Sequence, residues 1–150
     1  MPLDIHGWVE ITRHDEPERA DKHAWQAVLR LGALIDVADS ISERLFGLSK
    51  SWLAGTSRVP ALAANRGLPT NPSEEVRREI EEIRDLETRF GKGEFGGYTF
   101  ATWREIEGAG FSEAELDSSD WPLVFDLIRR LANDDRLSSD KIRLVAYSCW

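Results

Sequence analysis

The sequence predicts an α+β fold, in which a small, mainly antiparallel sheet includes both ends of the chain and helices pack on one face of that sheet. Three observations support this prediction. Leu3 to Ile11 alternate strictly between apolar and polar side chains, which is typical of a half-buried strand. Ile142 to Trp150 are apolar on both faces except for Arg143 and Ser148, which indicates a strand in the middle of a sheet, where the first strand can pair with it. Between these two segments, apolar residues recur at helical spacing.

The first third of the chain continues with a loop, a second strand and a helix. Residues 13–22 are polar and contain Pro17, which is typical of a connecting loop. Residues 24–31 fit either a strand or a helix, and we favour a strand. Between Gly32 and Gly47 apolar side chains recur at helical spacing, and Gly47 offers a C-terminal stop, so we expect one amphipathic helix there.

The middle of the chain combines an apolar loop with a strongly charged helix. Residues 48–70 hold glycines and prolines among small side chains, and we interpret them as an ordered loop that covers another part of the protein. The stretch Asn71–Glu74 combines an N-cap residue, a proline and a capping-box glutamate, which predicts a helix start. A narrow apolar stripe continues this helix to Phe90, and the glycines of residues 91–97 end it.

The last third of the chain holds a strand and several helices before the final strand. Residues 98–103 are predicted to form a strand. Capping boxes at Thr102–Glu105 and Ser112–Glu115 predict short helices. Residues 121–133 form a strong helical pattern with a predicted cap near Ser119.

Length and composition are typical of a single-domain globular protein. The 150 residues are 41% hydrophobic and 31% charged, which suits one domain over residues 1–150. A single cysteine, Cys149, cannot form an intrachain disulfide, and neither a signal peptide nor a membrane span is evident, so we expect a cytoplasmic protein. The net charge of −8 disfavours binding to nucleic acid or to an anionic membrane, whereas a small anionic ligand needs only a few local arginines.

Motifs for catalysis and metal binding are weak. Gly91–Gly96 matches the dinucleotide-binding spacing G-x-G-x-x-G, but here a helix precedes the turn and a strand follows it, the reverse of what pyrophosphate binding requires. Lys92 in this glycine loop is a candidate for closing over an anion. Asp4, His6 and Glu10 share one strand face, yet a hydrogen-bonded surface histidine is the simpler interpretation, and we expect no metal site and no cofactor. No nucleophile elbow or Walker motif is present.

Aromatic residues and arginines outside the apolar stripes suggest a ligand site. We expect the strand face that carries His6 and Trp8 to form one wall of a pocket, with residues 48–70 as its roof. The alternative is that a helix or the same loop merely covers Trp8. Aromatic rings stack on a base, and guanidinium groups bind phosphate. The candidate ligand-binding residues are His6, Trp8, Trp52, Arg66, Lys92, Tyr98, Trp103 and Arg104.

Four short motifs resemble a family of small uncharacterised proteins. DIHGWVE near the start of the chain, LFG at residues 45–47, RGLP at residues 66–69 and TWREI at residues 102–106 are similar to sequences from bacteriophages and their actinobacterial hosts. The resemblance carries no established chemistry with it. By association, a phage origin implies a protein that acts on host processes, such as a counter-defence protein that sequesters a nucleotide immune signal.

Three functions are consistent with these features. The leading hypothesis is a non-enzymatic protein that captures a small anionic, nucleotide-like ligand, in which Arg66 and Arg104 hold phosphate, Trp8 and Trp103 stack, and His6 forms a hydrogen bond. A homo-oligomer with the pocket near a subunit interface is a further expectation. The second hypothesis is an interaction module that binds and inhibits a basic host protein. The third is a small hydrolase that uses His6 with a neighbouring carboxylate.

Overall fold

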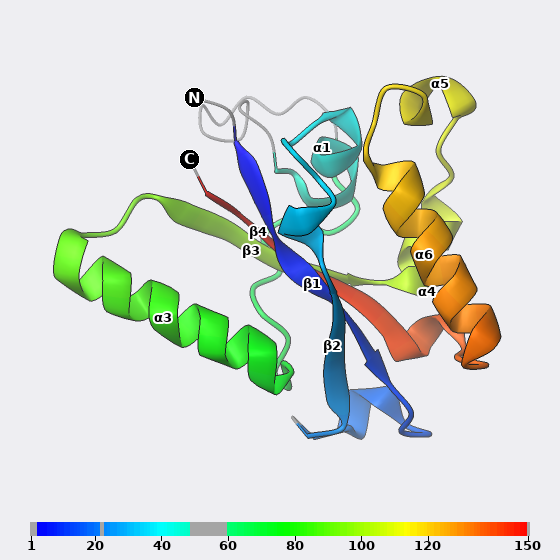
Figure 1. The fold of residues 1–150 in the computed structure, drawn as a ribbon, viewed down its shortest axis with the longest axis horizontal. Coiled ribbons are helices and arrows are strands. Elements are labelled where there is room, and N and C mark those ends of the chain that lie inside the picture. The colour runs from blue at the N-terminus through cyan, green and yellow to red at the C-terminus, as the bar shows by residue number, and fades with distance from the viewer. Residues whose placement is uncertain (1–2, 22, 49–59, 150) are drawn as a thin grey trace.

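The sheet takes its strands from both ends and the middle of the chain. In the computed structural model, which describes residues 3–21, 23–48 and 60–149, four antiparallel strands pair in the order β2-β1-β4-β3 (Figure 1). The α+β class is therefore confirmed, and the last strand lies beside the first in the middle of the sheet, as predicted. The strands are β1 (Asp4–Thr12), β2 (Trp25–Arg30), β3 (Phe95–Thr102) and β4 (Ile142–Cys149).

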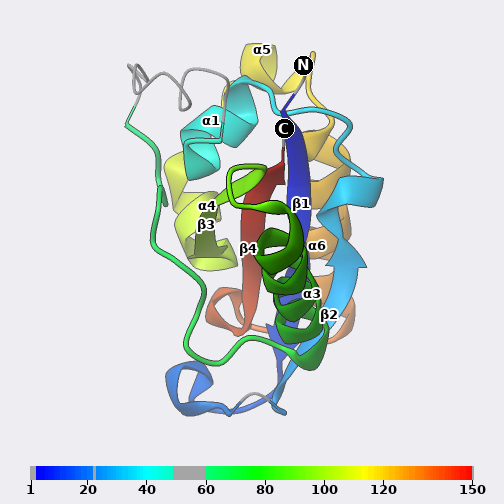
Figure 2. The same ribbon diagram turned by 90° about the vertical axis from the view of Figure 1, so that its left-hand side faces the viewer.

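One face of the sheet carries the larger apolar core. Odd-numbered residues of β1 and even-numbered residues of β4 point to this face because side chains alternate along a strand. The helices that cover this face are seen on the same side of the sheet in both ribbon views (Figures 1 and 2). They are α1 (Ser40–Phe46), α4 (Trp103–Ala109), α5 (Glu113–Leu116) and α6 (Trp121–Asp134).

A single long helix, α3 (Glu74–Phe90), lies on the opposite face (Figure 2). Helices therefore cover both faces of the sheet, whereas the sequence pattern predicts them on one face. The reason is that the second face is not simply polar: Val145 and Tyr147 of β4 form a second apolar cluster with Val76, Ile80 and Ile83 of α3. This cluster is the partner that the narrow apolar stripe of α3 requires.

Several predicted boundaries shift in the structure. Helix α1 begins only at Ser40, after Asp39 caps it, although it ends at Gly47 as predicted, with φ of 70°. Helix α3 begins at Glu74 with Ser73 as its N-cap, so the predicted cap of Asn71 was wrong. Strand β3 starts earlier than predicted, at Phe95, and ends at Thr102, which caps α4. Both predicted capping boxes, at Thr102–Glu105 and Ser112–Glu115, are present.

The two central strands approach each other closely at Gly7. A Cβ atom built on Gly7 would lie 1.9 Å from the carbonyl oxygen of Val145, and the residue has φ of 132°. Only glycine fits such a position without moving the backbone. Gly7 therefore fixes the contact between β1 and β4 on which both layers of helices depend.

The remaining segments cover the ends and one edge of the sheet. Residues 60–70 run along the outer edge of β3, where the Gly67 amide donates to the Tyr98 carbonyl at 2.9 Å. Short 3₁₀ helices are η1 (Pro17–Arg19), η2 (Leu31–Ala33) and η3 (Ser139–Lys141). None of the helices in the described ranges has the length and apolar character needed to cross a membrane.

Candidate functional site

A pocket of about 460 Å³ opens where the N-terminus of α3 meets the sheet. Four regions that are distant in sequence, residues 17–25, 66–71, 100–102 and 140–143, contribute to it, so it exists only in the folded chain. Apolar atoms make up most of its exposed wall, although charged, amide and hydroxyl side chains also line it. We call it the Trp25 pocket; it is lined by Pro17, Glu18, Trp25, Arg66, Leu68, Pro69, Thr70, Asn71, Phe100, Thr102, Asp140 and Arg143.

A buried ion pair holds one wall of the Trp25 pocket in place. Arg143 on β4 lies opposite Glu10 on β1, and its Nε donates to the Glu10 carboxylate at 2.7 Å. Its two Nη atoms donate to the side-chain and backbone oxygens of Asn71, each at 2.8 Å. Burial lowers the pKa of Arg143 and Glu10 opposes that effect, so the guanidinium stays charged. The other Glu10 oxygen accepts from the Ser73 amide at 2.6 Å, which ties the start of α3 to the sheet.

The Trp25 indole lies against this ion pair. The guanidinium carbon of Arg143 sits 3.7 Å from the centre of the indole ring, a close cation–π contact. Trp25 is buried, and among the described residues its indole N–H has no hydrogen-bond partner. A buried donor without a partner costs about 1–3 kcal/mol, so this atom favours any acceptor that reaches it.

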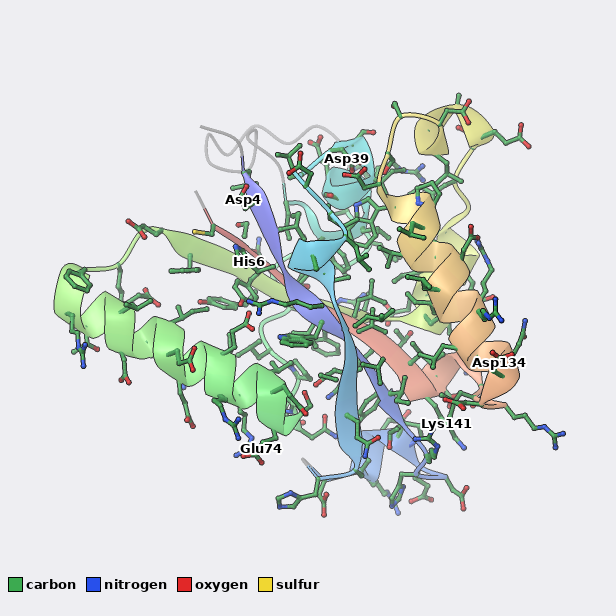
Figure 3. All side chains as sticks on the ribbon, viewed as in Figure 1. Asp4, His6, Asp39, Glu74, Asp134 and Lys141 are labelled. Carbon is green, nitrogen blue, oxygen red and sulfur yellow. The ribbon has the colours of Figure 1, made fainter. Side chains whose placement is uncertain are left out.

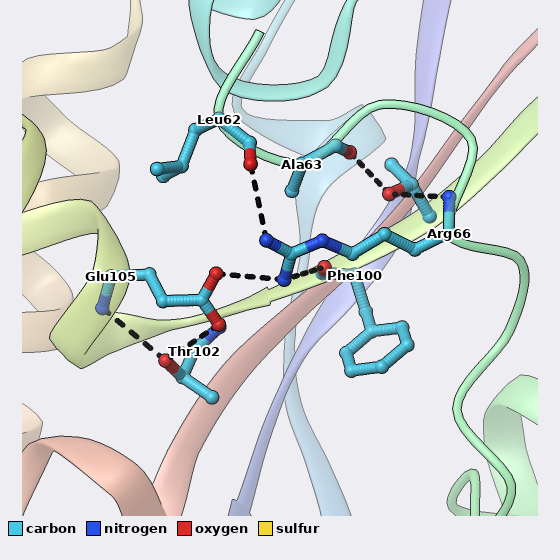
Figure 4. A network of polar contacts seen from close by, with 7 residues as sticks. Leu62, Ala63, Arg66, Phe100, Thr102 and Glu105 are labelled. Carbon is cyan, nitrogen blue, oxygen red and sulfur yellow. Dashed lines mark hydrogen bonds and ion pairs between the residues drawn. The ribbon is translucent and has the colours of Figure 1, made fainter.

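Arg66 lines the pocket, and its guanidinium group is held from three sides (Figure 4). Its Nη1 forms an ion pair with Glu105 at 2.7 Å and donates to the carbonyl of Phe100 at 3.4 Å, while Nη2 donates to the carbonyl of Leu62 at 3.1 Å. The Thr99 hydroxyl donates to the Ala63 carbonyl and fixes the loop that carries Arg66. The guanidinium is thus oriented before any ligand arrives.

Two acidic side chains in the pocket lining compensate the positive charge of the two arginines. Asp140 accepts a hydrogen bond from the Ser138 hydroxyl at 2.6 Å, which is the main reason that the pKa of Asp140 lies below its usual value. Arg104 lies 3.7 Å from Asp140 and adds to this effect. The lining of the pocket therefore carries two arginines, Arg66 and Arg143, against two carboxylates, Glu18 and Asp140.

The predicted site residues fall into separate places. Arg66 lines the Trp25 pocket, whereas Arg104 lies outside its lining and pairs with Asp140. Trp103 is buried in the main core, where its ring packs against Phe125 at 5.7 Å. Lys92 lies in the exposed turn between α3 and β3. Trp52 lies outside the described residues.

Three further predicted residues meet beneath α3. Trp8 donates from its indole nitrogen to Glu79 at 3.0 Å, so α3 covers Trp8, as the alternative interpretation expected. The Tyr147 hydroxyl donates to the other oxygen of Glu79. His6 stacks on the Tyr147 ring with centroids 5.5 Å apart, and Tyr98 lies 5.3 Å from the same ring. These residues form an aromatic cluster that is distinct from the lining of the Trp25 pocket.

The pairing of Glu10 also bears on the hydrolase hypothesis. Both oxygens of Glu10 are engaged, one by Arg143 and the other by the Ser73 amide, so this carboxylate is not positioned to act as a base with His6. Asp4 is exposed at the end of β1. Within the described ranges, no group of three His, Cys, Asp or Glu side chains is arranged to hold a metal ion.

Sequence reasoning missed most of the Trp25 pocket. Trp25 was assigned only to a possible strand, and Arg143 was noted only as an exception in an apolar segment. The usable signal was the pair of charges: Glu10 and Arg143 stand in strands expected to be neighbours, and a charge in a buried strand needs a partner. Comparisons with family models, curated proteins and solved structures found no match, so the resemblance to phage and actinobacterial proteins stays a prediction.

Proposed function

We propose that the protein is a non-enzymatic binding protein that captures a small nucleotide-like ligand in the Trp25 pocket. The volume of 460 Å³ lies within the range of about 300–1,000 Å³ typical of small-molecule sites. The observation that carries the proposal is that one largely apolar cavity is lined both by Arg66, whose guanidinium is held in place, and by the indole of Trp25, whose buried N–H has no partner among the described residues. Such a lining matches a planar ring with polar edges and one anionic group.

The charge of the lining narrows the ligand class. Two arginines face two carboxylates, so the pocket has no excess of positive charge to compensate a polyphosphate. Arg66 already pairs with Glu105 through Nη1, so we expect it to bind at most one further anionic group. We therefore favour nucleoside monophosphates and cyclic nucleotides over di- and triphosphates. A protein that holds such a ligand without converting it lowers its free concentration, as sequestration requires.

Thermal unfolding against a ligand panel tests the proposal. The panel contains nucleoside monophosphates, cyclic nucleotides, triphosphates and the corresponding nucleosides. A ligand at one hundred times its dissociation constant should stabilise the fold by about 2.7 kcal/mol. We expect the largest shift with a singly phosphorylated member, which chromatography should recover intact after incubation. No shift across the panel would refute a nucleotide-like ligand, and hydrolysed ligand would instead favour an enzyme.

Two variants place the ligand. Arg66→Gln should weaken binding because it removes the anion partner, and Trp25→Phe should weaken it because it keeps the ring and removes the N–H donor. Arg130→Gln is the matched control, since Arg130 is an exposed arginine on α6 whose partner, Asp134, also lies outside the lining. Equal affinity in the wild type, Arg66→Gln and Trp25→Phe would show that the ligand binds elsewhere.

A further inference from the structure

The C-terminal end of α3 carries apolar side chains that the sheet does not bury. The buried stripe of the helix consists of Val76, Ile80 and Ile83 and stops there. Beyond it, the side chain of Leu86 is 46% exposed and that of Phe90 is 83% exposed. The helix end projects beyond the strands at this point (Figure 1). Two large apolar side chains left exposed one turn apart at the same helix end are a candidate interaction site.

Half-buried aromatic rings lie at the same end of the sheet. Phe95 follows α3 by one short turn, and its ring lies 6.4 Å from both His6 and Tyr147. Tyr98, on the same strand as Phe95, lies 5.3 Å from Tyr147. Figure 3 shows His6 and Asp4 together at this end of β1. We call this the α3-end surface, made up of Leu86, Phe90, His6, Phe95 and Tyr98.

The charges around the α3-end surface are mainly negative. From residue 81 to residue 94 there are five acidic side chains and three basic ones, a difference of −2. Burial is the main cause of the raised pKa of Tyr98; Glu87 raises this pKa further and Arg84 lowers it. Burial likewise raises the pKa of Cys149, with contributions from Glu94 and Asp4. The net negative charge of residues 81–94 therefore favours a positively charged partner at this end.

We propose that the α3-end surface docks a basic polypeptide segment of a partner protein. Apolar side chains of that segment cover Leu86 and Phe90, and its arginine or lysine groups lie over the exposed ring faces and near the surrounding carboxylates. A second copy of this chain is a poor occupant because each copy carries a net charge of −8. This site is separate from the Trp25 pocket and does not depend on a ligand there.

Fluorescence anisotropy with two labelled peptides tests this proposal. One peptide carries arginine and leucine spaced by glycine, and its counterpart has glutamate in place of arginine. We expect the full-length protein to bind the arginine peptide alone, and to bind it at least about tenfold more weakly when the salt concentration rises from about 50 to about 500 mM. Absence of binding to the arginine peptide, or equal binding of both peptides, would overturn the proposal.

Substitutions distinguish docking at this surface from general attraction to an acidic protein. The double variant Leu86→Ala/Phe90→Ala should bind the arginine peptide about tenfold more weakly, with an unchanged unfolding transition because both side chains are exposed. Leu123→Ala, which removes a 54% exposed leucine from α6 on the other side of the sheet, is the matched control and should bind as the wild type does. Equal affinity of these two variants would overturn the proposal.

Two further measurements keep the test decisive. If the double variant unfolds more easily than expected, Asp4→Asn/Glu94→Gln provides an independent probe of the same surface, and unchanged peptide binding in it would count against the proposal. Light scattering gives the mass of the wild type and of the Leu86→Ala/Phe90→Ala variant. A wild-type dimer that this variant converts to a monomer would assign the surface to a second copy instead.

Discussion

The face of the sheet beneath α6 and the face beneath α3 are stabilised in different ways. Beneath α6 the contacts are apolar and continuous, from Ile5 and Leu144 on the strands to Ile128 on the helix. Beneath α3 the apolar cluster is smaller, and buried charges surround it. Glu10 and Arg143 hold the start of α3, and Glu79 ties the middle of the helix to Trp8 and Tyr147.

This difference shows what the polar groups contribute. Burial of apolar area has no preferred direction, so it stabilises a helix on a sheet without fixing its position along the sheet. Charged hydrogen bonds are directional and fail when the partner moves. The polar contacts beneath α3 therefore set where the helix begins, and with it the shape of the Trp25 pocket.

Arg143→Leu should have the largest effect on stability. It leaves the Glu10 carboxylate buried without its partner, which typically costs about 3–5 kcal/mol. Urea unfolding measures the loss. The double variant Glu10→Leu/Arg143→Leu should recover part of it, because no buried charge is left uncompensated. Arg13→Gln, in the exposed pair with Asp135, is the control and should cost less than about 1 kcal/mol. Strictly additive losses in the double variant would contradict this account of the ion pair.

The same truncation on the two helices compares their apolar cores directly. Ile128→Ala on α6 should cost about 3 kcal/mol, because Ile128 is fully buried among large side chains. Ile80→Ala on α3 should cost about 2 kcal/mol, because its cluster is smaller and several of its neighbours are only partly buried. Urea unfolding of both variants checks the order. A larger loss for Ile80→Ala would mean that the apolar contacts, not the polar ones, dominate beneath α3.

The sequence predicted correctly those elements whose pattern depends only on residues close together in the chain. Strict alternation marked β1 because one of its faces meets an apolar core and the other a mixed one. Capping boxes marked α4 and α5 because the bonds that form them join residues three apart. The start of α3 was misplaced because both Asn71 and Ser73 can cap a helix. Arg143, which comes from the other end of the chain, donates hydrogen bonds to the side-chain and backbone oxygens of Asn71. Ser73 is therefore the residue that caps the helix.

The candidate site was less predictable because its contacts are long-range. Arg66 was named as an anion partner and does line a pocket, but the residues that surround it come from η1, β2, β3 and β4. Trp103 was predicted to stack on a ligand, yet it is the first residue of α4 and its side chain is buried in the core. The register between strands decides which side chains line the pocket and which lie in the core. A single sequence contains few signals for that register. The opposed charges of Glu10 and Arg143 are one of them.

Glu79→Gln should produce a moderate loss of stability. The carboxylate of Glu79 accepts from the indole of Trp8 and from the hydroxyl of Tyr147, and a neutral amide offers only one oxygen to these two donors. We expect a loss of about 1–2 kcal/mol in urea unfolding. Glu82→Gln, an exposed change one turn further along α3, should leave stability within about 0.5 kcal/mol of the wild type. Equal losses of stability in the two variants would mean that the contacts of Glu79 with Trp8 and Tyr147 do not stabilise the face beneath α3.

The smallest effect concerns Tyr98, at the edge of the face beneath α3. Burial raises the pKa of Tyr98, and Glu87 raises it further, so the folded state favours the neutral phenol. The unfolded chain has a pKa near 10 at this residue, so the contribution of Tyr98 to stability is complete below about pH 10. It is then lost as the pH rises through the higher pKa of the folded state, because the unfolded state releases its proton first.

The measurement is the difference in unfolding free energy between wild type and Tyr98→Phe at several alkaline pH values. Phenylalanine cannot ionise, so the wild type should lose more stability than Tyr98→Phe above about pH 10, while the difference between them stays constant at lower pH. Other groups titrate in the same range, but they do so in both proteins and cancel in the difference. If the difference in unfolding free energy stays constant through the alkaline range, the pKa of Tyr98 is the same in the folded and the unfolded protein. The face beneath α3 would then be open to water at this edge, and its polar contacts would end at Glu79.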